Sequence, residues 1–299
     1  MTLDLTVFGD ICIDYFYEVN KLPGKDESAE ITRIHRYYGG MGANTAITAK
    51  KLGLKTAMVS VISSDNDASE YVKYIHKHRI DLFIEGRISE YTTHSMFFKK
   101  NDGDFFSFFH RGIAEKMNDI KVGVDLIKNS KAVFMPRTYL NLQRRVASKC
   151  RAKKKFLVYN PGYGVFKFNR IPEEFYRILK SVNVLVMNYH ELVHLRELGF
   201  ELNFRYGPEV FLVTKGSRGC SIYGHGIYED VPAFKTAVVD PAGAGDAFNA
   251  GFIASRLKGY SIADSVKIAN CTASFVIEKW GCQTNLPSWE QVMERFEEI

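Results

Sequence analysis

The segment DPAGAGDAFNAGF (240–252) places small residues and an acid where a helix is predicted to begin. Apolar residues follow with helical spacing until Gly259, so the small residues fall at a helix N-terminus. The first N–H groups of a helix lack partners and its dipole is positive there, and residues without bulk let a phosphate approach them. Gly243, Ala244 and Gly245 are therefore predicted to form an anion hole.

Asp246, the acid of this segment, has two interpretations. An acid in the first turn of a helix is a common stabiliser, worth about 0.3–1 kcal/mol. Beside an anion site, a carboxylate can instead accept the proton of an alcohol during phosphoryl transfer, and the pairing with the glycine-lined site favours this role as general base. The chain contains no GxxxxGKS/T segment, which excludes a P-loop, and GAGDAF lacks the third glycine of the dinucleotide fingerprint.

A second glycine cluster, YYGGMGANTA (37–46), also precedes a predicted helix. A tight turn explains the glycines by itself, but glycines such as Gly40 also let a ligand approach the backbone, and Asn44 offers both a donor and an acceptor. Asp10 and Asp14 follow the first predicted strand, at the expected carboxyl edge of the sheet. Carboxylates accept hydrogen bonds from vicinal hydroxyls, so these residues together predict a polyol pocket.

The hydrophobic pattern predicts a scaffold that brings these distant segments together. Short apolar runs alternate with segments of helical period, and this βαβ order predicts an α/β fold with a doubly wound, mostly parallel sheet flanked by helices. The predicted strands are residues 5–9, 56–62, 131–135, 155–159, 183–187 and 210–214, and the predicted helices include 44–53, 68–78 and 261–279. No long linker interrupts the pattern, so residues 1–299 are predicted to form a single domain.

Two stretches, 11–38 and 91–112, interrupt the βαβ order with aromatic and β-branched residues around turn signals such as NDGD (101–104). They are predicted to form antiparallel hairpins that project from the sheet. They are either ordinary edge strands or, packed together, a lid over a ligand or a subunit contact. A covered or lid-forming role is favoured by the many aromatic side chains of the second hairpin, which are Phe97, Phe98, Phe105, Phe106, Phe108 and Phe109.

The composition is that of an ordinary folded protein. Of 299 residues, 46% are hydrophobic and 25% are charged, which suffices for a large core. No apolar run approaches the roughly 20 residues needed to cross a bilayer, and the chain start lacks the basic region of a signal peptide, so we expect a cytoplasmic protein with no membrane partner. The net charge of +6 suits an anionic small molecule at least as well as nucleic acid, and no nucleic-acid partner is predicted.

The cysteines and the densest basic run carry weaker signals. The five cysteines are odd in number, scattered and never arranged as CxxC, so they predict neither a disulfide framework nor a zinc site. RAKKK (151–155) is predicted to be a solvated helix end before a strand, and a binding patch is the less favoured alternative.

Two further motifs complete the pattern: NYHE (188–191), after a predicted strand, and VTKGSRG (213–219). In the order and spacing of these motifs, over almost its full length, the chain resembles the PfkB, or ribokinase, superfamily. It looks most similar to the archaeal broad-specificity nucleoside kinases, through RYYGGMGANTAITAKKLG, VTKGSRG and the tail ASFVIEKWGCQTNLPSW, which belongs to the ATP side of such enzymes. The resemblance implies a doubly wound α/β core with a small β lid.

The resemblance implies a kinase that uses ATP and Mg²⁺ to phosphorylate the 5′-hydroxyl of ribonucleosides. Asp246 matches the base that receives the hydroxyl proton, and the amides around Gly243, Ala244 and Gly245 match the site of the γ-phosphoryl group. Two alternatives stay open: a ribokinase or other small-sugar kinase, and a non-catalytic nucleoside-binding protein on a kinase fold. The intact GAGD segment disfavours the second alternative.

The resemblance also implies contacts to the acceptor substrate, a small-molecule nucleoside or sugar. The predicted substrate-binding residues are Asp14, Gly40, Asn44, Tyr163, Phe98 and Phe109. The first three match sugar contacts of the family, with Asp14 at the ribose hydroxyls. Two lid phenylalanines are candidates to stack on a base, and the tyrosine is a candidate to face the substrate. A homodimer formed through the lid is expected from the family.

On the nucleotide side, the predicted ATP-binding residues are Asn188, Thr214, Gly216, Gly219 and Asn270. Asn188 and Glu191 match a family pair that organises magnesium, water and the phosphates, and Glu191 acts on the metal indirectly, through water. The alternative is structural, because an Asn followed three residues later by an acid also forms a capping box. A monovalent cation near Asp240 and residues 281–287 stays an open question.

Three departures from the family pattern change what is expected of the site. Met41 stands where ribokinase-type sequences often carry Lys, so a charged contact is missing. Pro241 and Ala242 replace the more usual threonines, and the backbone cradle is expected to survive without their hydroxyl contacts. Asn160 occupies a place often held by Asp, which leaves the preference among bases open.

Overall fold

A mixed β-sheet forms the centre of the computed structural model, which describes residues 2–88, 90–100, 105–121 and 124–298. Among these residues, nine strands pair in the order β13-β12-β11-β10-β9-β8-β1-β4-β5. All pairs from β11 to β5 are parallel, and β12 and β13 extend one edge antiparallel. The strands are β1 (Leu3–Phe8), β4 (Thr56–Ser63), β5 (Asp81–Ile88), β8 (Ser130–Pro136), β9 (Phe156–Asn160), β10 (Val184–Asn188), β11 (Val210–Thr214), β12 (Cys220–Gly224) and β13 (Ile227–Val231).

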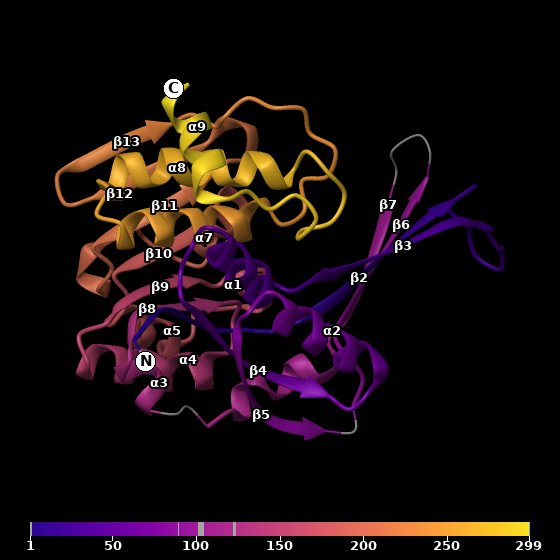
Figure 1. The fold of residues 1–299 in the computed structure, drawn as a ribbon, viewed down its shortest axis with the longest axis horizontal. Helices are drawn as coiled ribbons and strands as arrows, with labels where there is room; N and C mark the ends of the chain where they lie inside the picture. The colour runs from indigo at the N-terminus through magenta and orange to yellow at the C-terminus, as the bar shows by residue number, and fades with distance from the viewer. Residues whose placement is uncertain (1, 89, 101–104, 122–123, 299) are drawn as a thin grey trace.

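Helices cover both faces of this sheet (Figure 1). One core cluster joins the sheet to α1 (Met41–Lys51), α2 (Asn66–Lys77), α7 (Ala244–Leu257), α8 (Ile262–Val276) and α9 (Trp289–Glu297). The other joins it to α3 (Val124–Lys128), α4 (Leu140–Ala152), α5 (Glu173–Leu179) and α6 (Tyr189–Glu197). Strands buried on both faces must be apolar throughout, as in β4, whose eight residues are all buried. The predicted doubly wound α/β fold is confirmed.

A second, smaller sheet projects from the core (Figure 1). This lid sheet contains β2 (Cys12–Val19), β3 (Ile31–Gly39), β6 (His94–Lys100) and β7 (Phe105–His110), in the order β3-β2-β6-β7. Each predicted hairpin lies here as an antiparallel pair, and a parallel pairing of β2 with β6 joins the two. The turn NDGD (101–104) lies outside the described residues.

In the part of the chain that the structure describes, all helices are of modest length. None of them is both long enough and apolar enough to cross a membrane. The longest, α8, has 15 residues, and it packs against α7 and α9 within the core.

Candidate active site

Four polar side chains from distant segments meet at the carboxyl edge of the central sheet. Asp10 follows β1, Asp14 lies at the start of β2, Asn44 lies in the first turn of α1, and Asp246 lies in the first turn of α7. All four are buried, with exposed fractions between 1% and 9%. Asn44 Nδ2 donates a hydrogen bond of 2.7 Å to Asp246 Oδ2, which ties the two helix starts together.

Glycines make this convergence sterically possible. A Cβ on Gly39 would lie 2.0 Å from Asp14 Oδ2, and a Cβ on Gly42 would lie 2.6 Å from the Cα of Gly9. Gly40 has a φ of 95° and would place a Cβ 2.8 Å from the carbonyl oxygen of Asp10. Close approach of the backbone, and not only a tight turn, therefore accounts for the second glycine cluster.

Helix α7 begins with free backbone donors. Its N-cap, Gly243, has a φ of 79° and offers no side-chain cap to the first turn. The amide of Ala244 makes only a long bond of 3.4 Å to the Pro241 carbonyl, and among the described residues no carbonyl accepts from the amides of Gly245 or Asp246. A Cβ on Gly245 would meet no described atom within 4 Å, so the helix start faces open space. These amides can bind an anion there.

Burial sets the protonation behaviour of Asp246. Desolvation raises its pKa to about 7, and the negative charges of Asp10 and Asp14 act in the same direction. The hydrogen bond from Asn44 and the positive charge of Arg137 oppose this rise. Oδ1 of Asp246 accepts no hydrogen bond from any described residue and keeps some accessible surface. The carboxylate is thus half ionised near neutrality and has one oxygen free, as a general base requires.

Arg137, which the sequence did not single out, lies among the site carboxylates. It follows β8 with a φ of 61°, a conformation that is strained for a side chain of this kind. Its Nε lies 2.7 Å from Asp10 Oδ2, but the pair is not aligned as a hydrogen bond, so neither Asp10 oxygen has a hydrogen-bond partner among the described residues. Its charge also acts on the pKa values of Asp14 and Asp246. No sequence motif marks this position.

The lid sheet turns one face toward these residues. Tyr37, Asp14, Ser95 and Phe109 are partners in one row across the four strands, so their side chains share a face, here called the inner face. The Arg137 guanidinium lies 5.2 Å from the centroid of the Phe109 ring. The predicted aromatic contact Phe109 is therefore brought to the site.

Two other predicted aromatic contacts lie elsewhere. Phe98 lies on the opposite, outer face of the lid sheet, where it stacks on Tyr17 with ring centroids 4.7 Å apart, so the structure does not bring it to Asp14. Tyr163 follows the end of β9 with 70% of its surface exposed, and its ring lies 5.3 Å from that of Phe166. Its side chain is largely exposed to solvent.

The predicted nucleotide-side residues gather further along the same edge of the sheet. Asn188 and Thr214 are direct partners at the ends of β10 and β11. Gly216 and Gly219 follow in the loop to β12, both with positive φ; a Cβ on Gly219 would lie 2.0 Å from the carbonyl oxygen of Val231. Asn270 Nδ2 donates to the carbonyl of Pro232, in the segment that Gly219 also approaches.

Asn188 and Glu191 form a complete capping box at the start of α6. Asn188 Oδ1 accepts from the Glu191 amide, and Glu191 Oε2 accepts from the Asn188 amide, both at 2.9 Å. A third bond joins Asn188 Nδ2 to Glu191 Oε1. Burial raises the pKa of Glu191 to about 7. Asn188 and Glu191 therefore cap α6, as the structural alternative predicted. An additional, water-mediated contact of Glu191 to magnesium is compatible with this cap.

The donor set fits an indirectly held magnesium ion. In the part of the chain that the structure describes, no three His, Cys, Asp or Glu side chains group as a metal site. Mg²⁺ usually keeps several waters and binds substrate phosphates with one or two carboxylates, so a dedicated protein cage is not required. Glu191 is a buried carboxylate that a nearby cation would keep ionised.

Comparisons with known proteins agree with this geometry. The family model of the pfkB carbohydrate kinases matches residues 2–289. The chain belongs to the PfkB family of carbohydrate kinases. It is 32% identical to a nucleoside kinase of Methanocaldococcus jannaschii over 98% of this chain and 96% of that one. It is 29% identical to a nucleoside kinase of Methanothermobacter thermautotrophicus over 98% of this chain and 95% of the relative. A crystal structure of the M. jannaschii enzyme superposes with a TM-score of 0.89 and 30% identity, covering 100% of this chain and 99% of that one.

The two archaeal relatives confirm the predicted resemblance to archaeal nucleoside kinases, and the family match confirms the predicted class of enzyme. The protein is a phosphotransferase with an alcohol group as acceptor. Two of the three departures from the family pattern, Met41 and Asn160, have structural explanations. Met41 packs against Gly162, and Asn160 Oδ1 accepts from the amide of Gly162, so both residues support the turn after β9.

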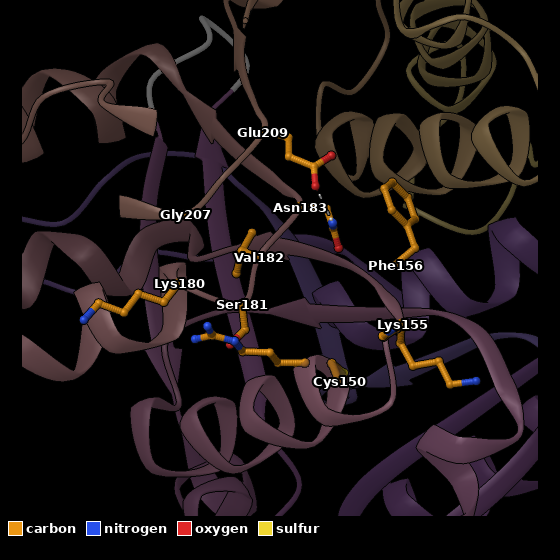
Figure 2. A pocket seen from close by; sticks show the side chains of 11 residues that line it. Cys150, Lys155, Phe156, Lys180, Ser181, Val182, Asn183, Gly207 and Glu209 are labelled. Atoms are coloured by element: carbon orange, nitrogen blue, oxygen red, sulfur yellow. Dashed lines mark hydrogen bonds between the residues drawn. The ribbon is translucent and has the colours of Figure 1, made fainter. Parts of the chain in front are cut away.

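The densest basic run of this PfkB protein lies at the opposite, amino edge of the sheet. It helps to line a cavity of about 420 Å³. Figure 2 shows the lining side chains, among them Phe156, the first residue of β9, and Asn183 before β10. The basic residues that line this cavity are Arg151, Lys154, Lys155 and Lys180. Lys155 Nζ donates to the carbonyl of Lys128, and basic residues are favoured at a helix C-terminus such as that of α4. The run is explained as a helix end.

Proposed function

We propose that the protein catalyses the ATP- and Mg²⁺-dependent phosphorylation of the 5′-hydroxyl of ribonucleosides. The observation that carries this proposal is the pairing of a buried carboxylate, Asp246, with free amides at the same helix start. The two archaeal nucleoside kinases that match over almost the whole chain support the choice of nucleoside over free sugar as acceptor.

The chemistry follows from this pairing. Oδ1 of Asp246, which accepts no other hydrogen bond, takes the proton of the 5′-hydroxyl. At the same time, the oxygen of that hydroxyl forms a bond to the γ-phosphorus. The bond between that phosphorus and the β–γ bridging oxygen breaks, and ADP leaves with the electron pair. The amides of Ala244, Gly245 and Asp246 stabilise the charge on the transferred phosphoryl group, because they are fixed by the helix before the reaction starts.

The acceptor is held by the buried polar residues and covered by the lid sheet. Asp14 accepts from ribose hydroxyls, while Gly40 and Asn44 provide the remaining sugar contacts. Phe109, on the inner face, lies where a base would extend beyond the ribose and can stack on it. Covering the site excludes water, which would otherwise compete as phosphoryl acceptor.

ATP lies along the edge formed by β10 and β11, with Thr214, Gly216, Gly219 and Asn270 around it. Asn188 and Glu191 would hold Mg²⁺ indirectly, through water, and the ion would neutralise phosphate charge. We also propose a monovalent cation near Asp240 and residues 281–287. Each Asp240 oxygen accepts one hydrogen bond, from the amide of Ala242 or of Gly281, and keeps a second lone pair that can bind a cation.

The outer face of the lid sheet supports the proposal of a homodimer. Ile34, Phe106 and Phe108 are 62%, 55% and 58% exposed there, beside the stacked pair Tyr17 and Phe98. Such a contiguous apolar surface is typical of a subunit contact. A cytoplasmic location is proposed with it, from the ordinary composition alone.

A substrate panel tests the proposed function. ADP formation is measured with Mg·ATP and inosine, cytidine, adenosine, ribose or fructose 6-phosphate, beside the thermal shift that each compound produces. We expect turnover and stabilisation with nucleosides, since a ligand at about 100 times its Kd stabilises the native state by about 2.7 kcal/mol. A response to sugars alone would show a small-sugar kinase, and stabilisation by nucleosides without ADP formation would show a binding protein.

A further inference from the structure

A chain of hydrogen bonds reaches Asp246 from the tail segment between α8 and α9. Gln283 Nε2 donates to Asn44 Oδ1 at 2.6 Å and to the Tyr71 hydroxyl at 2.7 Å. The Tyr71 hydroxyl donates in turn to the carbonyl of Gly39 at 2.6 Å, and Asn44 Nδ2 donates to Asp246 Oδ2. We call Tyr71, Gln283 and Asn44 the amide relay.

The Gly39 carbonyl, at the end of the amide relay away from Asp246, fixes which atom donates in every hydrogen bond of the relay. The Gly39 carbonyl can only accept, so the single proton of the Tyr71 hydroxyl points to it. The Tyr71 oxygen must then accept from Gln283, which must present its NH₂ group on this side. With that NH₂ group also facing Asn44, Asn44 must present its oxygen to Gln283 and its own NH₂ group to Asp246.

The relay is kept although it leaves one polar atom unsatisfied. Oε1 of Gln283 is buried and has no hydrogen-bond partner among the described residues. Leaving a buried acceptor unpaired costs roughly 1–3 kcal/mol, and natural proteins tolerate few such atoms. The Gln283 amide accepts this cost while it supplies the hydrogen bond to Asn44 Oδ1, a buried acceptor that an apolar side chain would leave without this partner.

We propose that Gln283 is a positioning residue that keeps Asn44 a hydrogen-bond donor to Asp246 at every stage of the reaction. The inference rests on the proposed function of Asp246 as the base. A freely rotating Asn44 amide could turn its oxygen toward Oδ2 of Asp246, where it would repel the carboxylate and accept a hydrogen bond only from a protonated Oδ2, so that the acid form would be stabilised. Because Gln283 holds that oxygen, Asn44 continues to favour the carboxylate, and the base is regenerated for the next turnover.

Other groups also face Asp246, and the test must separate their effects. Arg137 after β8 favours the ionised form, whereas Asp10 after β1 and Asp14 in β2 disfavour it. Cys282, beside the relay glutamine, is a buried thiol whose pKa lies well above its ordinary value because of desolvation, so it stays neutral in the working range of pH. Arg137, Asp10 and Asp14 lie outside the relay, and Cys282, which interacts with Asn44, carries no charge that could shift the limb.

The experiment is the pH profile of kcat/KM for nucleoside, which reports the pKa of the free enzyme's base. Gln283→Met keeps an unbranched chain of similar length and removes both donors. We expect its acidic limb to move to higher pH by about 0.5–1 pH unit, the effect of about one hydrogen bond to a charged group. Tyr71→Phe removes only the hydroxyl that accepts from Gln283. It should shift the acidic limb in the same direction, but by less than Gln283→Met does.

Gln291→Met is the matched control, because it makes the same chemical change in the capping box of α9, away from the relay. Its acidic limb should coincide with that of the wild type. A wild-type limb in Gln283→Met, or an equal shift in the control, would overturn the inference. If Gln283→Met does not give folded protein, Tyr71→Phe decides in the same way, since an unshifted limb there would also overturn it.

Asp246→Asn is assayed in parallel to separate this inference from the proposed function. Near wild-type rates in Asp246→Asn would refute the role of Asp246 and the relay together. A collapsed rate in that variant, with an unshifted limb in Gln283→Met, would refute the relay alone.

Discussion

The acceptor side and the nucleotide side of the site are built in opposite ways. Around Asp246, buried side chains bond to one another: Asn44 is 3% exposed and spans the distance between Gln283 and the carboxylate. Along β10 and β11, Asn188 and Gly216 are exposed, and the predicted contacts are mostly backbone positions and a helix cap. One side is specified by side chains and the other by backbone shape.

This difference matches what each side is proposed to recognise. A nucleoside must be distinguished from other alcohols and its hydroxyl deprotonated, which requires side chains held in place before binding. Phosphates are recognised through backbone N–H groups and charge, which many sequences can supply. Side-chain substitutions should therefore affect the acceptor side most, and the nucleotide side should respond mainly where the backbone is crowded.

The largest effect is expected from Asp246→Asn on the acceptor side. Removing a general base typically lowers turnover by about 10²–10⁴-fold, and kcat should fall within that range. The folded-state pKa of about 7 lies above that of an unfolded aspartate, so ionisation destabilises the wild type as pH rises from about 4 through 7. The variant escapes this loss, and its Tm at pH 8 should equal or exceed that of the wild type. A lower Tm together with lost nucleoside binding would attribute the defect to folding instead.

Arg137→Met should be the next largest change, through stability. It leaves Asp10 as a buried charge without its partner, which costs about 3 kcal/mol in the free energy of unfolding measured by denaturant. It also removes a positive charge that lowers the pKa of Asp246, so the acidic limb of kcat/KM should move to higher pH. The double variant Asp10→Asn/Arg137→Met should recover most of the stability, and its limb should shift less than that of Arg137→Met, because the Asp10 charge that raises the pKa of Asp246 is removed as well. Unrecovered stability would mean that Arg137 acts mainly through packing against Phe109.

Gly219→Ala tests the crowded part of the nucleotide side. Its Cβ would meet the Val231 carbonyl at 2.0 Å, at a φ of 82°, so we expect a loss of about 2–4 kcal/mol and a raised KM for ATP. The KM for nucleoside should change little. Gly216→Ala is the matched control, because that Cβ meets no described atom within 4 Å and only the backbone strain, about 1 kcal/mol, remains. Equal effects of the two substitutions would contradict the role of crowding.

Asn188→Ala should give the smallest change. Loss of the capping box costs about 1 kcal/mol of stability. If the residue also orders water around Mg²⁺, the Mg²⁺ concentration for half-maximal activity should rise, while the KM for nucleoside stays constant. Asn188→Asp, which can still cap the helix, separates the two roles: restored stability with a still altered Mg²⁺ dependence supports both, and full restoration supports capping alone.

Most of the fold and the centre of the site were predictable from local pattern. Continuous apolar runs such as those of β4 and β8 identify buried parallel strands because both faces are covered. The free amides at the start of α7 were predictable because small residues before a helix leave its first N–H groups without side-chain caps. The glycines near residue 40 were found, but their steric cause lies in contacts with distant segments.

The remaining parts depend on tertiary contacts that local pattern does not contain. Gln283 is separated from Asn44 by 239 residues and from Tyr71 by 212, so no spacing rule connects them. The alternation of a strand predicts that Phe97 and Phe98 face opposite sides of the lid sheet, but only the pairing with β2 decides that Phe97 shares the face of Asp14. Arg137 adopts a conformation that its residue type does not suggest.

The most direct test of the central claim is the pH dependence of kcat/KM for nucleoside, measured for the wild type and Asp246→Asn at saturating Mg·ATP. With a buried Asp246 as the base, the wild-type value should rise about tenfold per pH unit below a half-maximum near pH 7 and level off above it, and the residual rate of the variant should lack this limb. A wild-type half-maximum near pH 4, or the same limb in the variant, would contradict the account.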